Sequence, residues 1–296
     1  MAHNYNLQQL RHFDFSAVME ATTDESKAVA WAMEVGLLER SMLCPQCAQP
    51  MRLNAPKRYW RCCRKTRHAD GKQEQFSIFV NSWFSKMKLE LSQALRLMFA
   101  WCMRTPQPQA AHMANVSENT ASAWYAACRV LCSKELLSGE FKIKFWLLTG
   151  RWFGRVVYDK RTKATLLPII KKFIRPRTRI HSDMFASYVA ERGSQVHTLA
   201  NNRTLVSMHY EHSWVNHTLH FVDPVSGTRT NTIEGLWEMH IKRHIKEMSG
   251  WSKNYPDGYI DEYMWRSWFF FPTRASPGEF MCGLVQAVQR HPQQEE

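Results

Sequence analysis

Residues 230–237 read Thr-Asn-Thr-Ile-Glu-Gly-Leu-Trp, and residues 178–183 read Thr-Arg-Ile-His-Ser-Asp. The first stretch places Glu234 near the start of an apolar-faced helix, about fifty residues after Asp183. Asp183 follows a short run of strand-forming residues, so we expect it at the carboxyl end of a strand in an open α/β sheet, where such sheets build their sites. Two such acids could share a divalent metal ion, and two-metal phosphoryl transfer requires at least two well-placed carboxylates.

The chain is strongly basic. Its 296 residues include 39 Lys+Arg against 26 Asp+Glu, which gives a formal net charge of +13. This balance favours a polyanionic partner, because cationic side chains steer the partner electrostatically and release its counterions. The basic and aromatic run Lys-Arg-Tyr-Trp-Arg at 57–61 favours a nucleic acid as that partner.

Membrane insertion and secretion are not indicated. The sequence has no run of roughly 18 apolar residues, and its start lacks the apolar segment of a signal peptide. We therefore expect no membrane partner and a location in the nucleus, or in the cytoplasm if the protein is prokaryotic. Disulfides are rare in both compartments, so the scattered cysteines are expected to be buried thiols. They are Cys102, Cys128, Cys132 and Cys282.

The remaining cysteines fall within twenty residues of one another. Cys44 and Cys47 form a CxxC knuckle, and Cys62, Cys63 and His68 follow about fifteen residues later. This spacing is typical of a zinc ribbon, in which a tetrahedral ion replaces a core too small to stand alone. We predict one structural Zn²⁺ on Cys44, Cys47, Cys62 and His68, with Cys63 as the alternative third ligand. The competing interpretation is two pairs of reduced cysteines that bind no metal.

A helix-turn-helix pattern comes next. After an amphipathic helix over 88–103, residues 109–114 predict a short helix, 115–116 a turn, and Ser117 the cap of a longer helix that reaches about Cys132. In helix-turn-helix proteins the second helix enters the major groove with its N-terminal side chains. Asn119 and Ser122 are therefore the expected base readers. The alternative is an ordinary helical hairpin in a helical core.

Further elements are expected from residue patterns. A helix should begin at a capping box formed by Thr22 and Glu25 and run to Leu38. Later expectations are β-type runs at 144–148 and 152–158, a helix over 164–173, a strand at 178–183 followed by a short helix, a strand-like pair at 221–222, and a last helix over 259–270. The polar residues 291–296 are expected to form a disordered tail.

Taken in order, these motifs resemble the IS1595-type and Merlin-type transposases, which carry an ISXO2-like catalytic domain. The resemblance runs from about residue 28 to about residue 270. Its most specific marks are Phe-Val-Asp-Pro at 221–224, the 230–234 stretch with Trp237, and Tyr-Met-Trp-Arg at 263–266. Less specific marks include the 44–47 knuckle, Ser-Trp-Phe at 82–84 and Gln-Ala-Ala at 109–111.

The resemblance implies an α/β RNase H-like catalytic domain preceded by a small zinc ribbon and a helical helix-turn-helix region. It also implies a DDE triad that uses Mg²⁺ to nick transposon ends and join them to target DNA, with Asp183 as the second acid and Glu234 as the third. The partner would be double-stranded DNA, ancestrally transposon terminal repeats, and homodimerisation is compatible with this function. The expected backbone contacts come from Arg58, Arg61, Arg64, Lys65 and Arg67.

The first acid of the triad is missing from its expected place. No aspartate occurs between Asp70 and Asp159. Asp159 corresponds to a different position of the family, and Glu140 substitutes only if the strand register allows it. Removing one charge that stabilises the reacting atoms typically costs ~10²–10³ in rate, so we expect lost or impaired catalysis, with Mg²⁺ required only if catalysis persists. Compared with the family, this segment is also too short by roughly a strand and its hairpin. The loss of the strand is either genuine or an error in the gene's exon boundaries.

Two alternatives remain open. One is an active Mg²⁺-dependent DDE transposase with an unrecognised first acid, and the other is a non-enzymatic zinc-ribbon and helix-turn-helix regulatory or interaction module. The expected organisation is shared by all three interpretations. It comprises an N-terminal helical segment (1–40), the zinc ribbon (41–85), the helix-turn-helix region (86–138), the ISXO2-like domain without its first strand (139–275) and a C-terminal tail (276–296).

Overall fold

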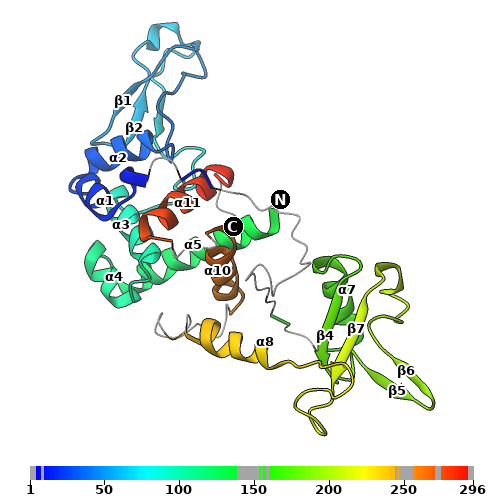
Figure 1. Ribbon diagram of the computed structural model, residues 1–296. Helices are drawn as coiled ribbons and strands as arrows, with labels where there is room; N and C mark the ends of the chain where they lie inside the picture. Colours follow the sequence, from blue (N-terminus) through cyan, green and yellow to red (C-terminus); the bar gives the residue numbers. More distant parts are fainter. Residues whose placement is uncertain are drawn as a thin grey trace. The chain divides into compact units, whose positions relative to one another are not determined.

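The computed structural model describes residues 5–7, 10–138, 154, 156–157, 160–243, 246, 256–270 and 275–292. The chain divides into two compact units (Figure 1). The discontinuous unit comprises His3–Glu135 together with Phe269–Glu296, and the central unit comprises Leu136–Trp268 together with Met1–Ala2. Within the described ranges, no helix is both long enough and apolar enough to cross a bilayer.

Helices dominate the discontinuous unit. They are η1 (Leu10–His12), α1 (Phe15–Ala21), α2 (Glu25–Glu34), α3 (Leu91–Cys102), α4 (Gln107–Ala114), α5 (Glu118–Ser138, which runs to the unit boundary) and α11 (Pro277–Arg290). Helix α3 lies at the centre, since ten of its twelve residues are buried. Helices α1, α2, α4 and α11 pack against it. This helical core also buries the scattered thiols at 102, 128, 132 and 282, as expected.

The first helices begin differently from the sequence-based expectation. Helix α2 is present, but its N-cap is Asp24, whose carboxylate accepts a hydrogen bond from the Lys27 amide at 2.9 Å. The predicted capping box at Thr22 is wrong, because Thr22 ends helix α1 and its hydroxyl donates to the Val18 carbonyl at 2.8 Å. Helix α1 has only seven residues, too few to show a helical period in the sequence.

Helix α11 replaces most of the expected C-terminal tail. Ser276 and Glu279 form a capping box at its start, and its apolar face enters the core. The Phe280 ring packs edge-on against Phe270, with ring centroids 4.8 Å apart. Gly278 allows a close approach to the backbone of Phe13, because a Cβ atom there would lie 2.9 Å from the Phe13 carbonyl oxygen.

A buried carboxylate connects segments from both ends of the unit. Glu135 on α5 is fully buried and accepts a 2.6 Å hydrogen bond from the Tyr5 hydroxyl. The same carboxylate pairs with Arg290 of α11 and lies 3.0 Å from the His291 imidazole. Charge-assisted bonds of this kind are among the stronger ones in proteins.

A three-stranded antiparallel sheet extends from the helices. Its strands are β1 (Arg52–Asn54), β2 (Tyr59–Arg61) and β3 (Gln75–Ser77), in the order β1-β2-β3. Trp60 at its centre is buried. At the base of the sheet, the Trp124 ring of α5 packs against Trp83 and Phe84, with centroid distances of 5.4 and 6.3 Å. These contacts join the small sheet to the helical core.

The central unit is a mixed α/β structure. Its described elements are α7 (Lys163–Phe173), β4 (Arg179–Asp183), β5 (Ala190–Arg192), β6 (Gln195–His197), η3 (Val206–Met208), β7 (Glu211–Val215), α8 (Asn231–Leu236), the π-helical turn η4 (Trp237–Lys242) and α10 (Pro256–Phe269, which reaches the unit boundary). Strands β4 and β7 are parallel, with Asp183 opposite Val215, and β5 and β6 form an antiparallel hairpin. Leu167 of α7 joins Leu199, Leu205, Met208 and Tyr210 in a buried cluster.

Several expectations for the central unit are wrong. The strand-like pair Phe221–Val222 forms no strand and is exposed; the partner of β4 is β7 instead. The sequence of β7, Glu-His-Ser-Trp-Val, lacks the apolar run of a buried parallel strand, which explains why it was missed. The short helix expected after Asp183 is only a turn at 186–188. The β-type runs at 144–148 and, for the most part, 152–158 lie outside the described residues.

Candidate metal centre and acidic site

Three short segments around the small sheet carry the predicted metal ligands. Cys44 and Cys47 lie on a tight turn, in which the Ala48 amide donates to the Cys44 carbonyl at 2.8 Å and Ala48 adopts a φ of 51°. Cys62 directly follows β2, and His68 directly follows the short helix η2 (Lys65–Arg67). The sheet thus fixes one cysteine, while two local turns present the other three groups.

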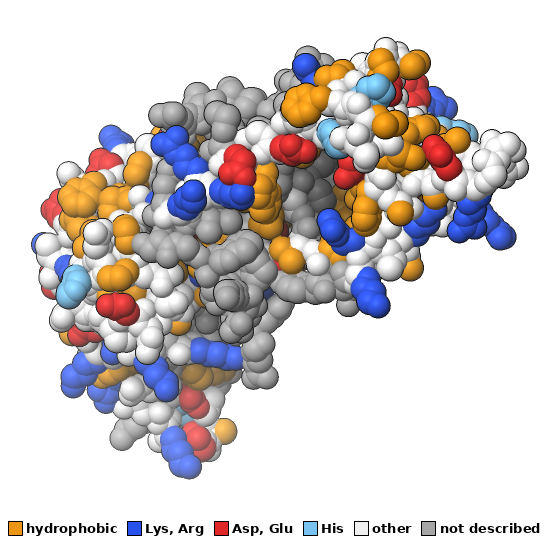
Figure 2. All heavy atoms as spheres, turned by 90° about the horizontal axis from the view of Figure 1, so that it is seen from below, with side chains coloured by type: hydrophobic (Ala, Val, Ile, Leu, Met, Phe, Trp, Pro, Cys, Tyr) orange, Lys and Arg blue, Asp and Glu red, His pale blue; other side chains and the backbone are white. Residues whose placement is uncertain are grey.

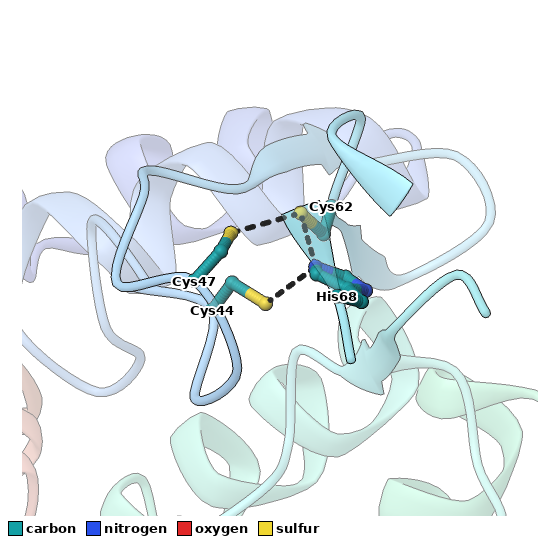
Figure 3. A group of neighbouring side chains, drawn as sticks. All are labelled: Cys44, Cys47, Cys62 and His68. Atoms are coloured by element: carbon teal, nitrogen blue, oxygen red, sulfur yellow. Dashed lines mark hydrogen bonds between the residues drawn. The ribbon is translucent and has the colours of Figure 1, made fainter. Parts of the chain in front are cut away.

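The four side chains converge (Figure 3). Their ligand atoms all lie within 4.8 Å of one another. The Cys44 and Cys62 sulfur atoms are each 3.3 Å from the Nε2 atom of His68, and the Cys47 and Cys62 sulfur atoms are 3.7 Å apart. A tetrahedral zinc ion with Zn–S bonds of ≈ 2.3 Å and a Zn–N bond of ≈ 2.0 Å needs edges of roughly 3.5–3.8 Å between ligand atoms. These three separations match the edges of a tetrahedral site to within a few tenths of an ångström.

Neighbouring groups prepare the ligands for a metal ion. The Nδ1 atom of His68 lies 2.5 Å from the Lys72 carbonyl oxygen, which directs Nε2 toward the sulfur atoms, as in many metal sites. This bond raises the pKa of His68 from 6.5 to about 8. Burial raises the pKa of the Cys47 thiol, but hydrogen bonds from the Gln49 backbone, His68 and Cys62 outweigh burial and lower it to about 7.

The structure distinguishes Cys62 from its neighbour Cys63. The Cys62 side chain is buried in the cluster, and its sulfur atom also accepts from the Arg64 amide at 3.4 Å. Cys63 is exposed, and its sulfur atom is 4.0 Å from the Arg61 carbonyl oxygen. Adjacent residues of an extended chain point to opposite sides, so only Cys62 faces the other three ligands.

The donor set fits a closed structural site. Three sulfur atoms and one imidazole nitrogen fill a tetrahedral shell, whereas a catalytic zinc ion keeps one position open for water or substrate. Three of the four residues are buried. Among the described residues, this is the one group of three or more cysteine, histidine or acidic side chains close enough to hold a metal ion. The arrangement can hold a metal ion but offers it no open coordination position.

Basic side chains surround this centre. Arg61, Arg64 and Arg67 are exposed, and the first two donate to glutamine side chains, Gln73 at 2.6 Å and Gln49 at 2.7 Å. Neutral partners leave the positive charge of both guanidinium groups available. The backbone of Lys65 lies in η2, and its side chain is outside the described part.

Arg58 differs from the other predicted DNA contacts. Its guanidinium group lies 3.4 Å from the Glu25 carboxylate and donates to the Leu89 carbonyl at 3.1 Å. Glu25 in turn accepts from the Leu91 and Ser92 amides at the start of α3. Arg58 therefore connects the small sheet to two helices, and its charge is partly neutralised within the protein.

The two predicted base readers lie in the first turns of α5. The Ser117 hydroxyl caps this helix by accepting from the Thr120 amide at 3.2 Å. Asn119 is exposed and Ser122 is half-buried. Asn115, with a φ of 53°, ends α4 in the left-handed conformation, so the two helices are separated by a tight turn.

The acidic site begins at the carboxyl end of β4. Asp183 is exposed there, beside the half-buried Tyr188. Burial raises the pKa of the Tyr188 hydroxyl, and the negative charge of Asp183 raises it further. On the opposite face of β4, Ser182 lies 3.0 Å from the His212 imidazole of β7.

Two histidines connect the β4–β7 strand pair to the segment that leads into α8. The Nδ1 atom of His181 on β4 is 3.1 Å from the Thr228 hydroxyl, and the Nε2 atom of His217, just after β7, is 2.7 Å from the Thr230 hydroxyl. Thr230 is the N-cap of α8. Glu234 follows one helical turn later, roughly 6 Å along the helix at ≈ 1.5 Å per residue, and is exposed. No spacing in the sequence predicts these histidine–threonine pairs.

In the described part of the chain, neither Asp183 nor Glu234 belongs to a group of three or more ligating side chains close enough to hold a metal ion. Glu140 and Asp159, the two acids considered for the first position of the triad, both lie outside the described residues. The described geometry thus contains two candidate acids from one end of a parallel strand pair and the helix tied to it.

Comparisons with known proteins give one relative. The chain is 30% identical over 111 residues to an uncharacterised transposase-like protein of Haemophilus influenzae. The aligned part covers 38% of this chain and 76% of that protein. No protein-family model matches the chain, and no solved structure matches it.

Proposed function

The chain belongs to a family of transposase-like proteins, and from this premise we propose that it is a transposase-derived, DNA-binding protein with lost or impaired strand-transfer activity. More narrowly, we propose that it descends from the IS1595-type and Merlin-type transposases. The motifs at 221–224, 230–237 and 263–266 support this assignment. The observation that carries the functional proposal is the relationship to a transposase-like protein, combined with the two acids at the carboxyl end of β4 and the start of α8.

We propose that the metal of the cysteine centre is Zn²⁺, held by Cys44, Cys47, Cys62 and His68. Thiolate and imidazole ligands in a tetrahedral set favour zinc over magnesium or calcium, which prefer oxygen. The ion would fix the turns around the small sheet and, with no open position, take no part in chemistry. This supports the expected zinc ribbon at 41–85.

DNA binding is proposed for the ribbon and the two helices after it. Arg61, Arg64, Lys65 and Arg67 would contact the phosphate backbone, and Asn119 and Ser122 would reach base edges from α5. The tight turn between α4 and α5 supports a helix-turn-helix arrangement. Arg58 is better explained as a structural link, because its guanidinium group is already bonded to Glu25 and to the Leu89 carbonyl.

For the central unit we propose an RNase H-like ancestry, with Asp183 and Glu234 as remnants of a DDE triad. The parallel pair β4 and β7 and the tethered helix α8 support this assignment. With the first acid lost, two carboxylates would hold a hydrated Mg²⁺ ion only weakly. In this proposal residues 139–275 form the former catalytic domain, the partner is double-stranded DNA, and the protein acts as a monomer or homodimer in the nucleus or, in a prokaryote, the cytoplasm.

A nicking assay tests the proposal. The full chain and its Asp183→Asn, Glu234→Gln double variant are incubated with supercoiled plasmid carrying terminal-repeat DNA, with Mg²⁺ or EDTA. We expect DNA binding by both proteins and no nicking above that of the double variant. Nicking by the wild type that needs Mg²⁺ and is absent from the double variant would establish an active transposase instead. The regulatory module would be favoured if the double variant still binds DNA at low salt and the wild type binds no Mg²⁺.

A further inference from the structure

The loop between β7 and α8 concentrates exposed apolar side chains. Within residues 216–230, the exposed fraction is 70% for Leu219, 70% for Phe221, 41% for Val222 and 94% for Val225. Single exposed apolar residues are normal on a protein surface, but contiguous exposed apolar surface marks an interaction site. Four such residues lie within seven positions of this loop, called the apolar loop below, which makes it a candidate interaction site.

The apolar loop is held in a defined conformation. The Asp223 carboxylate accepts hydrogen bonds from the Val225 amide at 3.2 Å, the Ser226 amide at 2.6 Å and the Ser226 hydroxyl at 2.7 Å. The Asp223 amide donates to the Thr228 carbonyl at 2.9 Å, and Gly227 completes the turn with a φ of 67°. A loop ordered in advance loses little conformational entropy when it binds, which favours binding.

The apolar loop is also fixed to the acidic site. Thr228 and Thr230 bond to His181 and His217 at the carboxyl end of the strand pair that bears Asp183. The Phe221 ring packs edge-on against the His217 ring, with centroids 6.5 Å apart. Phe221 thus lies near the carboxyl end of the strand pair, where β4 ends at Asp183.

The surroundings of the apolar loop suit a nucleic acid. His217, His220 and Arg229 are exposed around its apolar side chains, and the chain carries a net charge of +13. Figure 2 shows exposed hydrophobic side chains beside histidine, lysine and arginine side chains on the face drawn. Apolar side chains flanked by cationic groups match the flat faces of nucleic-acid bases next to their phosphates, because bases stack on aromatic rings and apolar side chains insert between base steps.

We propose that Phe221 inserts into or against the base stack of DNA held at the acidic site, and that Leu219, Val222 and Val225 support the unstacked bases. This inference rests on the proposed function, since it requires that the protein binds DNA. An unstacked step beside the two acids would expose one strand to them. The same contact would hold distorted or unpaired DNA at this edge even without cleavage.

Binding to two probes tests this role. The full chain is titrated with a fully paired DNA duplex and with the same duplex carrying a short unpaired bubble that contains 2-aminopurine. We expect the bubble duplex to bind more tightly by roughly five- to a hundredfold, the affinity that one base stacked on an aromatic ring contributes. The 2-aminopurine fluorescence should change on binding, because it reports the loss of stacking with neighbouring bases.

Three variants make the test specific. Phe221→Ala should remove the preference for the bubble, whereas Phe221→Trp should retain it. Val206→Ala serves as the control, because Val206 is also exposed, at 54%, in the central unit but outside the apolar loop. Zinc content and circular dichroism establish that each variant is folded.

Each other outcome overturns the proposal in a recognisable way. If the wild type binds both duplexes equally, the apolar loop has no base-stacking role, although DNA binding stands. If it binds neither duplex at low salt, the proposed function fails together with this inference. If the wild type sediments as a dimer and Phe221→Ala as a monomer, the loop is an interface between two copies and does not face DNA.

Discussion

Replacing Cys62 and Cys63 separately by serine should have opposite outcomes, although the two cysteines are adjacent. In the structure the Cys62 sulfur atom is 3.7 Å from that of Cys47 and 3.3 Å from the Nε2 atom of His68. The Cys63 side chain is exposed and outside the cluster. Cys62→Ser therefore removes one of four ligands, while Cys63→Ser removes none.

The expected magnitude follows from how little else stabilises the small sheet. Within residues 44–77 the large apolar side chains that are buried are Met51 and Trp60, and each contributes only about 1.5–3 kcal/mol. A structural zinc ion in a comparable small domain contributes about 10–16 kcal/mol. We expect Cys62→Ser to weaken zinc binding by at least ~10²-fold and to unfold residues 44–77 locally, with the helical core intact.

Metal analysis and limited trypsin digestion measure both effects. The wild type and Cys63→Ser should carry one equivalent of zinc and resist cleavage after Arg61 and Arg64, whereas Cys62→Ser and the EDTA-treated wild type should be cut there quickly. Zinc binding should also weaken as the pH falls below about 8 and then about 7, because His68 and Cys47 must lose their protons to bind the ion. A wild type with less than about half an equivalent of zinc, or loss of zinc from Cys63→Ser alone, would refute the site.

Other predictions concern DNA contacts, protonation and packing. Changing Arg61 and Arg64 together to glutamine should weaken DNA binding and lower the salt slope of the log–log binding plot by about 1.8, since each phosphate contact contributes ≈ 0.9; an unchanged slope in a filter-binding titration would exclude both residues from the interface. Burial and the nearby His181 lower the pKa of His212 from 6.5 to about 4. Between pH 4 and pH 6.5 the unfolded chain therefore binds more protons than the folded chain. The central unit should therefore lose about 1–2 kcal/mol of unfolding free energy as the pH falls from 6.5 to 4, after discounting for partial exposure, and urea denaturation of His212→Gln should lack this loss. Gly278→Ala should destabilise the discontinuous unit by about 1–3 kcal/mol because of the close contact described above. Gly235→Ala in α8 should not destabilise the protein, because an added Cβ atom there would meet no atom within 4 Å. Equal melting temperatures for both variants would contradict the tight packing of α11.

The cysteine centre could be predicted from the sequence because its chemistry depends on local spacing. A CxxC turn brings two sulfur atoms together whatever surrounds it. The sequence leaves Cys62 and Cys63 as alternatives for the third ligand, and the structure, in which Cys62 is buried and Cys63 exposed, distinguishes them. Helices such as α3 and α5 were equally predictable, since their apolar period and caps lie within the helices themselves.

Long-range contacts could not be predicted in this way. Strand β7 is half-polar in sequence, and its pairing with β4 depends on residues about thirty positions away. The bonds of His181 and His217 to two threonines join segments that no spacing rule connects. Helix α11 is amphipathic, but its partner α3 lies far away in the chain, so the sequence alone predicts only a tail for residues 276–296.

The two-part composition of the discontinuous unit has a consequence for how the chain folds during synthesis. Residues 136–268 of the central unit are continuous and can fold as soon as they leave the ribosome, whereas the discontinuous unit needs its last helix, α11, to complete its core. The buried carboxylate of Glu135 likewise gains its partners Arg290 and His291 only after the end of α11 has been synthesised. The proposed DNA-binding surface should therefore become fully stable only after α11 has been made, so a polypeptide that terminates before α11 would be a poor competitor for DNA.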